Sequence, residues 1–297
     1  MTAALITVYN PTADVSDNIR TIAAQVDAVH ICDNSAYDNG SLFQNIPGNI
    51  CYTRFGENLG LSCAFNRVLK APDIHWQPDD YVCFFDQDSA IVPGHMDALR
   101  AVYEDLLGNG HKVGCLGPAF FNTSSGRVEM PKQKTEILPD TFAVSSVITS
   151  SMLCRYGELE AVGFWNEDIF LDMADWDLCW RLLAEGKLCC MTGAVVFRHS
   201  VGSGERKIGP LRLRVGQPFR EYYQIRDCLH LFRKPYTPLK YRIRFLAMVF
   251  VRSPLHLLFL DNRKARASYI GKGIADYFRK KRGALELSGK AQADSHT

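Results

Sequence analysis

The sequence predicts an α/β protein in which a Rossmann-like, mostly parallel central sheet is flanked by helices and followed by a basic helical C-terminal appendage. Two observations predict the sheet. Short, β-branched apolar runs alternate with helix-like segments through the first half of the chain, and several of these runs end in polar or turn-forming residues. A third observation predicts the appendage, because the periodicity becomes helical and the charge becomes basic beyond Tyr222.

The apolar runs and the turn residues between them define the expected elements. Strands are predicted over residues 4–9, 28–33, 50–55, 81–86 and 113–118, and crossover helices over 14–28, 61–69 and from Pro93 to about Leu107. Residues 121–139 contain Gly, Ser and Pro and predict a loop or hairpin, whereas 142–154 returns to strand character. A helix over 175–185 ends at Gly186. We expect one catalytic domain over 1–230 and a basic helical region over 231–297.

Composition and charge describe the whole chain. Its 297 residues can bury a substantial core, and 47% hydrophobic with 22% charged residues is typical of a globular protein. The net charge of +2 hides a split, because residues 233–283 contain 14 Lys/Arg and 2 Asp/Glu while the rest contains 20 basic and 30 acidic residues. An acidic body therefore carries a basic C-terminal region.

Cysteines and apolar segments predict the compartment. The ten cysteines lie mostly in apolar runs without a C-x-x-C pair or a zinc-type Cys/His spacing, which predicts small buried side chains in a reducing compartment. The N-terminus lacks the basic and long apolar regions of a signal peptide. The longest apolar stretch, residues 245–260, has 16 residues and is interrupted by Arg252 and Pro254, so no transmembrane helix is expected. We expect a cytoplasmic protein.

The acidic segment Asp86-Gln87-Asp88 follows the apolar run 81–85, so its carboxylates emerge at the carboxyl end of a buried strand. Ligands of open α/β sheets bind at that edge. Carboxylate oxygens there can hold Mg²⁺ or Mn²⁺, which offsets the charge that develops on a departing diphosphate. A bare Asp-x-Asp is more often a turn or a helix cap, and the preceding strand favours the metal here.

A second acidic segment, with Asp172, Asp175 and Asp177, begins a helix that buries Leu178 and Leu182. Carboxylates in a first helical turn stabilise the helix N-terminus, which explains one aspartate better than three. An aspartate beside an apolar surface can also act as a general base that deprotonates a hydroxyl group. Together, the two acidic segments predict group transfer from a phosphorylated donor.

Six segments resemble, in order, the motifs of family 2 glycosyltransferases over about three quarters of the chain. They are Thr7-Val8-Tyr9-Asn10, Asp33-Asn34-Ser35, Asn58-Leu59-Gly60 with Asn66, Phe85-Asp86-Gln87-Asp88-Ser89, Ile148-Thr149-Ser150-Ser151 and the stretch from Phe170 to Arg181. The Asp-Gln-Asp-Ser form and residues 222–227 look most like the bacterial rhamnosyltransferase branch, which acts on lipopolysaccharide core, O-antigen or related surface glycans. The resemblance implies a GT-A fold.

The resemblance also implies donor-binding residues. Asp33 would accept a hydrogen bond from the pyrimidine N3–H, although it could also simply shape a turn. The further implied contacts are Thr7 and Tyr9 to the nucleotide, Asn58 and Asn66 to the nucleotide or ribose, Asp86 and Gln87 to the ribose or sugar, and Arg226 closing on the donor. Asn-Leu-Gly is also ordinary turn chemistry, and Arg226 with Tyr223 could equally form a packed helix face.

Catalytic and metal roles follow from the same resemblance. The catalytic motif of the family is usually Glu-Asp, but Ala174 precedes Asp175 here, so Asp175 takes the base position and Asp172 is the second candidate. Asp88 would bind the divalent cation, Mg²⁺ or Mn²⁺, with His199 as a further ligand, although a strand-end histidine is more often structural. The implied reaction is an inverting single displacement, which converts dTDP-β-L-rhamnose into an α-L-rhamnoside.

Other functions stay open from the sequence. The donor could be a UDP-hexose such as UDP-glucose or UDP-galactose, and the missing glutamate would also fit an inactive nucleotide-sugar-binding protein. Residues 236–260 interleave basic with apolar side chains, which suits either a helix in an anionic membrane interface or a solvated face on the acidic body. Nucleic-acid binding is disfavoured because no recognised module accompanies the basic segment. The expected partners are a nucleotide sugar, a glycan or glycolipid acceptor and the inner face of the cytoplasmic membrane.

Overall fold

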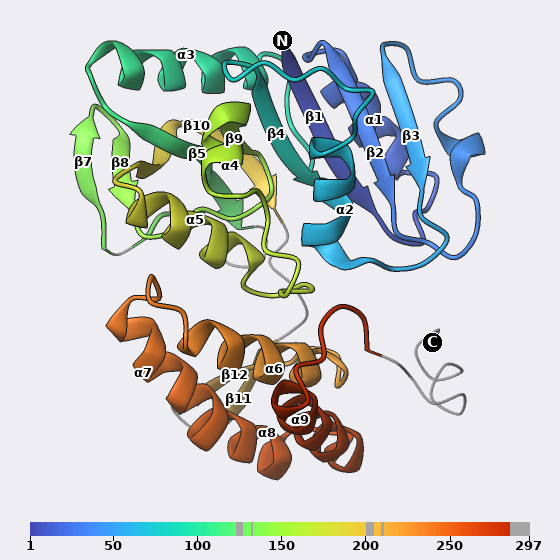
Figure 1. The fold of residues 1–297 in the computed structure, drawn as a ribbon, viewed down its shortest axis with the longest axis vertical. Helices are drawn as coiled ribbons and strands as arrows, with labels where there is room; N and C mark the ends of the chain where they lie inside the picture. The colour runs from blue at the N-terminus through green and yellow to red at the C-terminus, as the bar shows by residue number, and fades with distance from the viewer. Residues whose placement is uncertain (123–126, 132, 200–204, 209–210, 286–297) are drawn as a thin grey trace.

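One large twisted sheet forms the core of the N-terminal part (Figure 1). The computed structural model describes residues 1–122, 127–131, 133–199, 205–208 and 211–285. Within these residues, the sheet runs in the order β3 (Ile50–Arg54), β2 (Ala28–Asp33), β1 (Thr2–Val8), β4 (Tyr81–Asp86), β9 (Met152–Arg155), β5 (Val113–Asn122), β10 (Leu188–His199), β8 (Thr141–Val144) and β7 (Thr135–Leu138), and β6 (Arg127–Glu129) pairs with β5. The α/β class predicted from the sequence is confirmed.

Helices cover both faces of the sheet because successive strand residues point to opposite sides. Ala4, Ile6 and Val8 of β1 belong to the core shared with α1 and α3, whereas Ala3 and Leu5 belong to the core shared with α2, α4 and α5. These helices are α1 (Val15–Ala23), α2 (Gly60–Leu69), α3 (His95–Gly108), α4 (Tyr156–Ala161) and α5 (Ala174–Ala184), with a short 3₁₀ turn at Gly40–Leu42. The result is a three-layer arrangement.

The sheet is parallel in its first half and mixed in its second. Strands β3, β2, β1 and β4 are all parallel, as the alternating pattern predicts, and β5 is parallel to β10. By contrast, β9 is antiparallel to β4 and β5, and β8 is antiparallel to β7 and β10. The prediction of a mostly parallel sheet therefore holds only for the first part, because the short connections of residues 127–155 leave no room for crossover helices.

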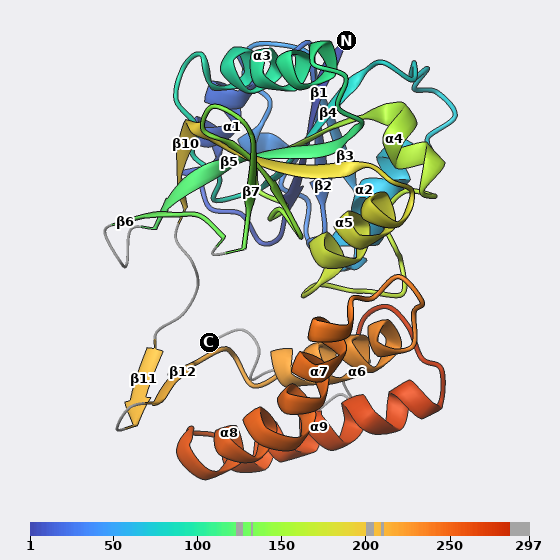
Figure 2. The same cartoon turned by 90° about the vertical axis from the view of Figure 1, so that its left-hand side faces the viewer.

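The C-terminal helices form a separate layer below the α/β body (Figures 1 and 2). This helical unit contains α6 (Arg220–Phe232), α7 (Leu239–Ala247), a π-helical turn η2 (Met248–Arg252), α8 (Ser253–Phe259) and α9 (Arg263–Phe278), and the hairpin β11 (Glu205–Ile208) and β12 (Leu211–Arg214) precedes it. A Cβ on Gly273 of α9 would lie 2.8 Å from the carbonyl oxygen of Tyr222, so glycine allows α9 to pack closely on α6. Because α6 packs on α9, the helical unit begins near Arg220, earlier than the predicted boundary at 231.

Aromatic packing and one buried carboxylate join the helical unit to the body. The ring of Trp180 in α5 lies 4.5 Å from that of Tyr241 and 6.2 Å from that of Phe245, both in α7. The hydroxyl of Tyr236 donates a hydrogen bond of 2.6 Å to Asp177, whose side chain is buried. The N-terminal turn of α5 therefore lies between the sheet and the helical unit.

Candidate functional site

The ends of three parallel strands bring predicted site residues to one edge of the sheet. Asp33, at the end of β2, is in register with Val8 of β1, and Asp86, at the end of β4, is in register with Thr7 of β1. Tyr9 follows β1 directly and is 47% exposed. The polar residues that follow these strands therefore lie together at the edge where ligands of open α/β sheets bind.

The loop after β4 is held by bonds to its neighbours. Ser150 donates a hydrogen bond to the carboxylate of Asp86, and the backbone N–H of Asp86 donates to Ser89 Oγ over 3.1 Å. The backbone N–H of Tyr9 donates to Gln87 Oε1 over 2.8 Å, so Gln87 connects the ends of β1 and β4. Asp88 is exposed at the tip of this loop. This arrangement positions Asp86 and leaves Asp88 facing solvent.

Asp175 lies in the first turn of α5, whose N-cap residue Met173 has a left-handed backbone (φ 74°). Burial, together with the smaller effects of Cys179 and of the carboxylates of Asp172 and Asp86, raises the pKa of Asp175 to about 7. The end of β4 and the start of α5, which are distant in sequence, thus bring Asp86, Asp172 and Asp175 close enough to interact electrostatically, and we call these three residues the acidic cluster. A carboxyl group whose pKa is near neutral can take up a proton at physiological pH.

The helical unit reaches the acidic cluster through Asp172. The guanidinium of Arg220 forms an ion pair with Asp172, and Gln224 Nε2 donates a hydrogen bond of 2.9 Å to the same carboxylate. Both residues lie on α6. They are 48 and 52 residues from Asp172 in the chain, and no local signal in the sequence pointed to them.

The charge of the cluster suits a divalent cation. Arg220 pairs with Asp172, and carboxylate oxygens such as those of Asp86 and Asp175 are the ligands that Mg²⁺ and Mn²⁺ prefer. Asp86 and Asp88 are the residues that would hold such an ion. Among the described side chains, no group of three or more close ligand atoms includes Asp86, Asp88, Asp172 or Asp175, so water and the donor would complete the coordination. His199 is the last residue of β10, and its side chain lies outside the part that the structure describes.

Asp33 is fully buried, and its carboxylate already accepts three hydrogen bonds. Oδ1 accepts from the backbone N–H of Ser35 (2.8 Å), and Oδ2 accepts from Tyr52 Oη (2.6 Å) and Asn39 Nδ2 (2.9 Å). These bonds shape the loop after β2. The contact with a pyrimidine N3–H stays a prediction.

The two asparagines predicted to contact the nucleotide have structural partners. Asn58 Oδ1 accepts a hydrogen bond of 3.0 Å from Gly60 N–H, the turn chemistry that was the alternative for this segment. Asn66 is 2% exposed, and its amide group bonds to both backbone groups of Trp165 and to Glu167. The prediction for Asn66 is wrong in this structure, because its amide fixes the loop before α5 and does not face the strand ends.

The predicted donor contact of Arg226 is also wrong. Its side chain is 0% exposed inside the helical unit, where it forms an ion pair of 2.7 Å with Asp227 and donates 2.7 Å to the carbonyl oxygen of Gly283. Its neighbour Tyr223 stacks on Phe170 with ring centroids 4.4 Å apart. The packed helix face, which the sequence left open as the alternative, is the structure that forms.

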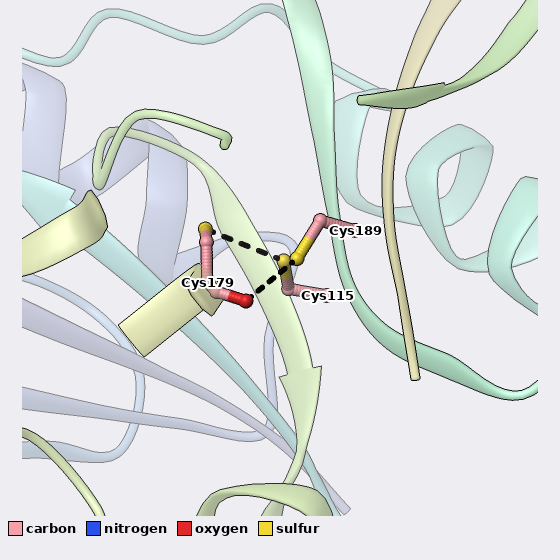
Figure 3. A group of neighbouring side chains, drawn as sticks. All are labelled: Cys115, Cys179 and Cys189. Carbon is pink, nitrogen blue, oxygen red and sulfur yellow. Dashed lines mark hydrogen bonds between the residues drawn. The ribbon is translucent and has the colours of Figure 1, made fainter. Parts of the chain in front are cut away.

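Three buried thiols connect α5 to the sheet (Figure 3). Cys115 Sγ of β5 lies 3.9 Å from Cys179 Sγ of α5, and Cys189 Sγ of β10 donates 3.4 Å to the carbonyl oxygen of Cys179. All three side chains are fully buried, and no charged ligand joins them in the described part of the chain. We interpret them as packing contacts that hold α5, and thereby Asp175, against the sheet.

Thiol exposure makes a direct prediction. All ten cysteines are free, eight are buried, Cys51 is exposed and Cys63 is half-buried with a pKa that burial raises. Because the thiolate is the reactive form, we expect a disulfide reagent such as DTNB to modify Cys51 quickly and Cys63 slowly, with the eight others reacting after denaturation. Absorbance of the released thiolate measures the phases. The control Cys51→Ser should lose the fast phase, and rapid modification of the buried thiols in the native protein would contradict this picture.

A separate cavity of about 730 Å³ lies at the opposite edge of the sheet, where β1 begins. Its lining includes Thr2, Arg20, Asp27, Asp97 and Arg100, from β1, α1, α3 and the segments beside them. It contains none of the predicted site residues, and the carboxyl ends of the strands face away from it. The candidate site is therefore identified by the chemistry of the acidic residues and not by this cavity.

Comparison with known proteins concerns the class of enzyme and the fold. The chain is 24% identical over 203 residues to "dTDP-rhamnosyl transferase RfbF" of Shigella flexneri, which covers 65% of this chain and 66% of that protein. The chain thus spans slightly less than two thirds of that relative. No family model matches the chain. The similarity supports the transferase class that the sequence predicted.

Solved structures confirm the predicted GT-A fold. The chain superposes on S. aureus TarS with a TM-score of 0.53 at 13% identity, covering 94% of this chain and 49% of TarS. It superposes on GalNAc-T7, solved with UDP, GalNAc and Mn²⁺, with a TM-score of 0.51 at 8% identity, covering 86% of this chain and 57% of that chain. The chain therefore spans about half of each of these proteins, and at such identities the likeness concerns the fold.

Proposed function

We propose that this chain is an inverting glycosyltransferase that moves L-rhamnose from dTDP-β-L-rhamnose to a hydroxyl group of a bacterial surface glycan or glycolipid. The observation that carries the proposal is Asp175, a carboxyl group at the start of α5 with a pKa of about 7 and beside Asp172 and Asp86. The similarity to a rhamnosyltransferase supports the choice of donor.

The proposed reaction uses these groups as follows. The carboxylate of Asp175 takes the proton of the acceptor hydroxyl, and the acceptor oxygen forms a bond to the anomeric carbon of the donor. The bond between that carbon and the diphosphate oxygen breaks, and its electron pair leaves with the diphosphate. Attack on the face opposite the leaving group inverts the anomeric configuration, so the product is an α-L-rhamnoside.

Asp86 and Asp88 would bind the donor end of the reaction. A divalent cation held there would offset the negative charge on the departing diphosphate. Ser150 orients Asp86, and Gln87 joins the loop to β1. The Mn²⁺ in the GalNAc-T7 structure supports a cation of this kind, Mg²⁺ or Mn²⁺, for this chain as well.

Calorimetric titration of donors tests the proposal. We expect dTDP-rhamnose to bind more tightly than UDP-glucose, UDP-galactose or GDP-mannose, and to lose about tenfold or more in affinity when EDTA replaces Mg²⁺ or Mn²⁺. Asp88→Asn should show the same loss with metal present, because a neutral amide is a weaker ligand than a carboxylate. Asp105→Asn, at another exposed carboxylate on α3, is the matched control.

Each other outcome selects a different function. Tighter binding of a UDP-hexose would keep the glycosyltransferase and remove the rhamnosyl donor. Binding that ignores EDTA and the Asp88 substitution would remove the metal role of that loop. Donor binding without any product, over a range of acceptors, would favour a nucleotide-sugar-binding protein.

A further inference from the structure

The helix that runs from α7 through η2 to α8 carries exposed apolar side chains along one face. Five of them have large exposed fractions, and we call this set the outer stripe. It consists of Leu239 (72%), Ile243 (59%), Leu246 (45%), Phe250 (72%) and Leu258 (61%). Exposed apolar side chains scattered singly are ordinary, but a continuous row on one helix is a feature of interaction surfaces.

The outer stripe is a regular consequence of helix geometry. Its first four members follow one another at steps of four, three and four residues, which places them on one side of a helix. The opposite side of α7 is buried, because Tyr241 and Phe245 pack against Trp176 and Trp180. The π-helical turn η2 contains more residues per turn than an α-helix, so the two steps of four residues from Phe250 to Leu258 stay near the same face.

Basic residues are interspersed with the outer stripe along the sequence. Residues 239–264 contain six Lys or Arg and one acidic residue, Asp261. Lys240, beside the stripe on α7, is exposed, and Arg263 and Lys264 are exposed at the start of α9, directly after α8. Figure 2 places α8 on the side of the helical unit that faces away from the sheet. The stripe with its basic border is thus on a part of the molecule that the α/β body does not cover.

We propose that the outer stripe docks on an anionic phospholipid membrane. Apolar side chains enter the boundary between headgroups and acyl chains, while Lys and Arg pair with the anionic headgroups. A second copy of this chain, paired through the same face, would bring like charges together, whereas an anionic membrane complements them. Among the described helices, none is long and apolar enough to cross a bilayer, so the contact is a surface one.

The proposal of membrane docking depends only on this surface and does not require the protein to be an enzyme. A second inference, about the acceptor, rests on the proposed function. Arg220 and Gln224 of the helical unit bind Asp172 of the acidic cluster, so a docked helical unit would hold that cluster near a membrane. An acceptor carried by a lipid is then the substrate class that fits the site.

Vesicle flotation of the full chain tests the docking. We expect the protein to float with vesicles of phosphatidylcholine plus phosphatidylglycerol, to float poorly with phosphatidylcholine alone, and to lose binding in high salt. The double variant I243E/F250E should weaken partitioning by about tenfold or more. The variant K240Q/K264Q should weaken it by about fivefold for each charge removed. The matched control V92E/V128E adds the same charges at exposed positions of the α/β body and should float like the wild type.

Several results would overturn the proposal. These are a wild-type protein that does not float with anionic vesicles, equal flotation with neutral vesicles, and unchanged flotation of I243E/F250E. Light scattering that shows a dimer broken by I243E/F250E, without flotation of the wild type, would assign the face to a second copy. If I243E/F250E fails to fold by circular dichroism, I243S/F250S gives the same comparison with a smaller change. No assay here uses a sugar donor, so failure of docking and failure of the proposed transfer are separate results.

Discussion

Replacing Asp175 with asparagine should abolish sugar transfer while donor binding persists. An amide cannot accept the proton of the acceptor hydroxyl, and the loss of a general base lowers the rate by about 10²–10⁴-fold. Asp175 lies at the start of α5 and not in the loop of Asp86 and Asp88, so the donor should bind Asp175→Asn with nearly the wild-type affinity. Initial rates of product formation and calorimetric donor titration measure the two effects. Residual activity within about tenfold of the wild type would remove Asp175 as the base.

The pH dependence gives the same residue a second signature. Because burial and neighbouring carboxylates raise the pKa of Asp175 to about 7, the rate should fall as the pH drops below about 7 and the base becomes protonated. In Asp172→Asn one neighbouring negative charge is gone, so this acidic limb should move to lower pH. An acidic limb that does not move in Asp172→Asn would show that another group controls it.

Stability should respond in the opposite direction from activity. A buried carboxyl with a raised pKa stabilises the fold when protonated, at pH values below its unfolded pKa, and this contribution is lost as the pH rises through about 7. Asp175→Asn should therefore resemble the wild type below about pH 4, become progressively the more stable protein between about pH 4 and 7, and keep this advantage at higher pH. Asp227 also has a pKa raised by burial to about 7, but it is common to both proteins, so their difference reports Asp175.

Replacing Asp177 with alanine should instead destabilise the whole protein. The side chain of Asp177 is 0% exposed, and it accepts hydrogen bonds from Arg181 (2.7 Å), Asn166 (3.0 Å) and Tyr236 (2.6 Å). Removing one partner of a buried ion pair leaves the other charge uncompensated, which costs about 3–5 kcal/mol. We expect the free energy of unfolding to fall by about this amount, as measured by urea or thermal denaturation.

A milder substitution distinguishes the contribution of the Asp177–Arg181 ion pair from that of the hydrogen bond between Tyr236 and Asp177. Tyr236→Phe removes one hydroxyl donor to Asp177 and leaves Arg181 in place, so it should cost about 1 kcal/mol. If Asp177→Ala changed the free energy of unfolding by less than about 0.5 kcal/mol, the hydrogen bonds and the ion pair of Asp177 would not stabilise the protein. The proposed difference between a stabilising Asp177 and a catalytic Asp175 would then have no support.

The fold was largely predictable because it follows from local patterns. Four consecutive apolar runs became parallel strands within one or two residues of the expected bounds. They could be recognised because successive strand residues are buried in the cores on opposite faces of the sheet, as those of β1 are, so each strand is a short continuous apolar run. The polar residues after β1, β2 and β4 met at one edge for the same reason. The antiparallel second half was less predictable, because pairing between β8, β9 and β10 depends on contacts between distant strands.

The sequence predicted the location of the candidate site better than it predicted the contacts of each candidate residue. Residues Asp86, Asp172 and Asp175 came together as one acidic cluster, as two acidic segments beside strand ends and a helix start suggested. The sequence alone could not show that Arg220 and Gln224 bind Asp172, that Asn66 holds the backbone of Trp165, or that Arg226 is buried. In each case the residue and its partner are 48 to 99 residues apart in the chain, so no local pattern links them.

The sequence by itself determined the α/β class, the edge of the sheet where the site forms, the acidic body with its basic C-terminal region and the apolar stripe of the last helices. These properties depend on the order and spacing of residue types, which act over a few positions. The tertiary structure decided which of three neighbouring aspartates are paired with a cation. The physical reason is that Asp172 pairs with Arg220 and Asp177 pairs with Arg181, whereas Asp175 has no ion pair among the described residues and has a pKa raised to about 7. Burial and charge partners belong to the folded chain, and they set the role of each carboxylate.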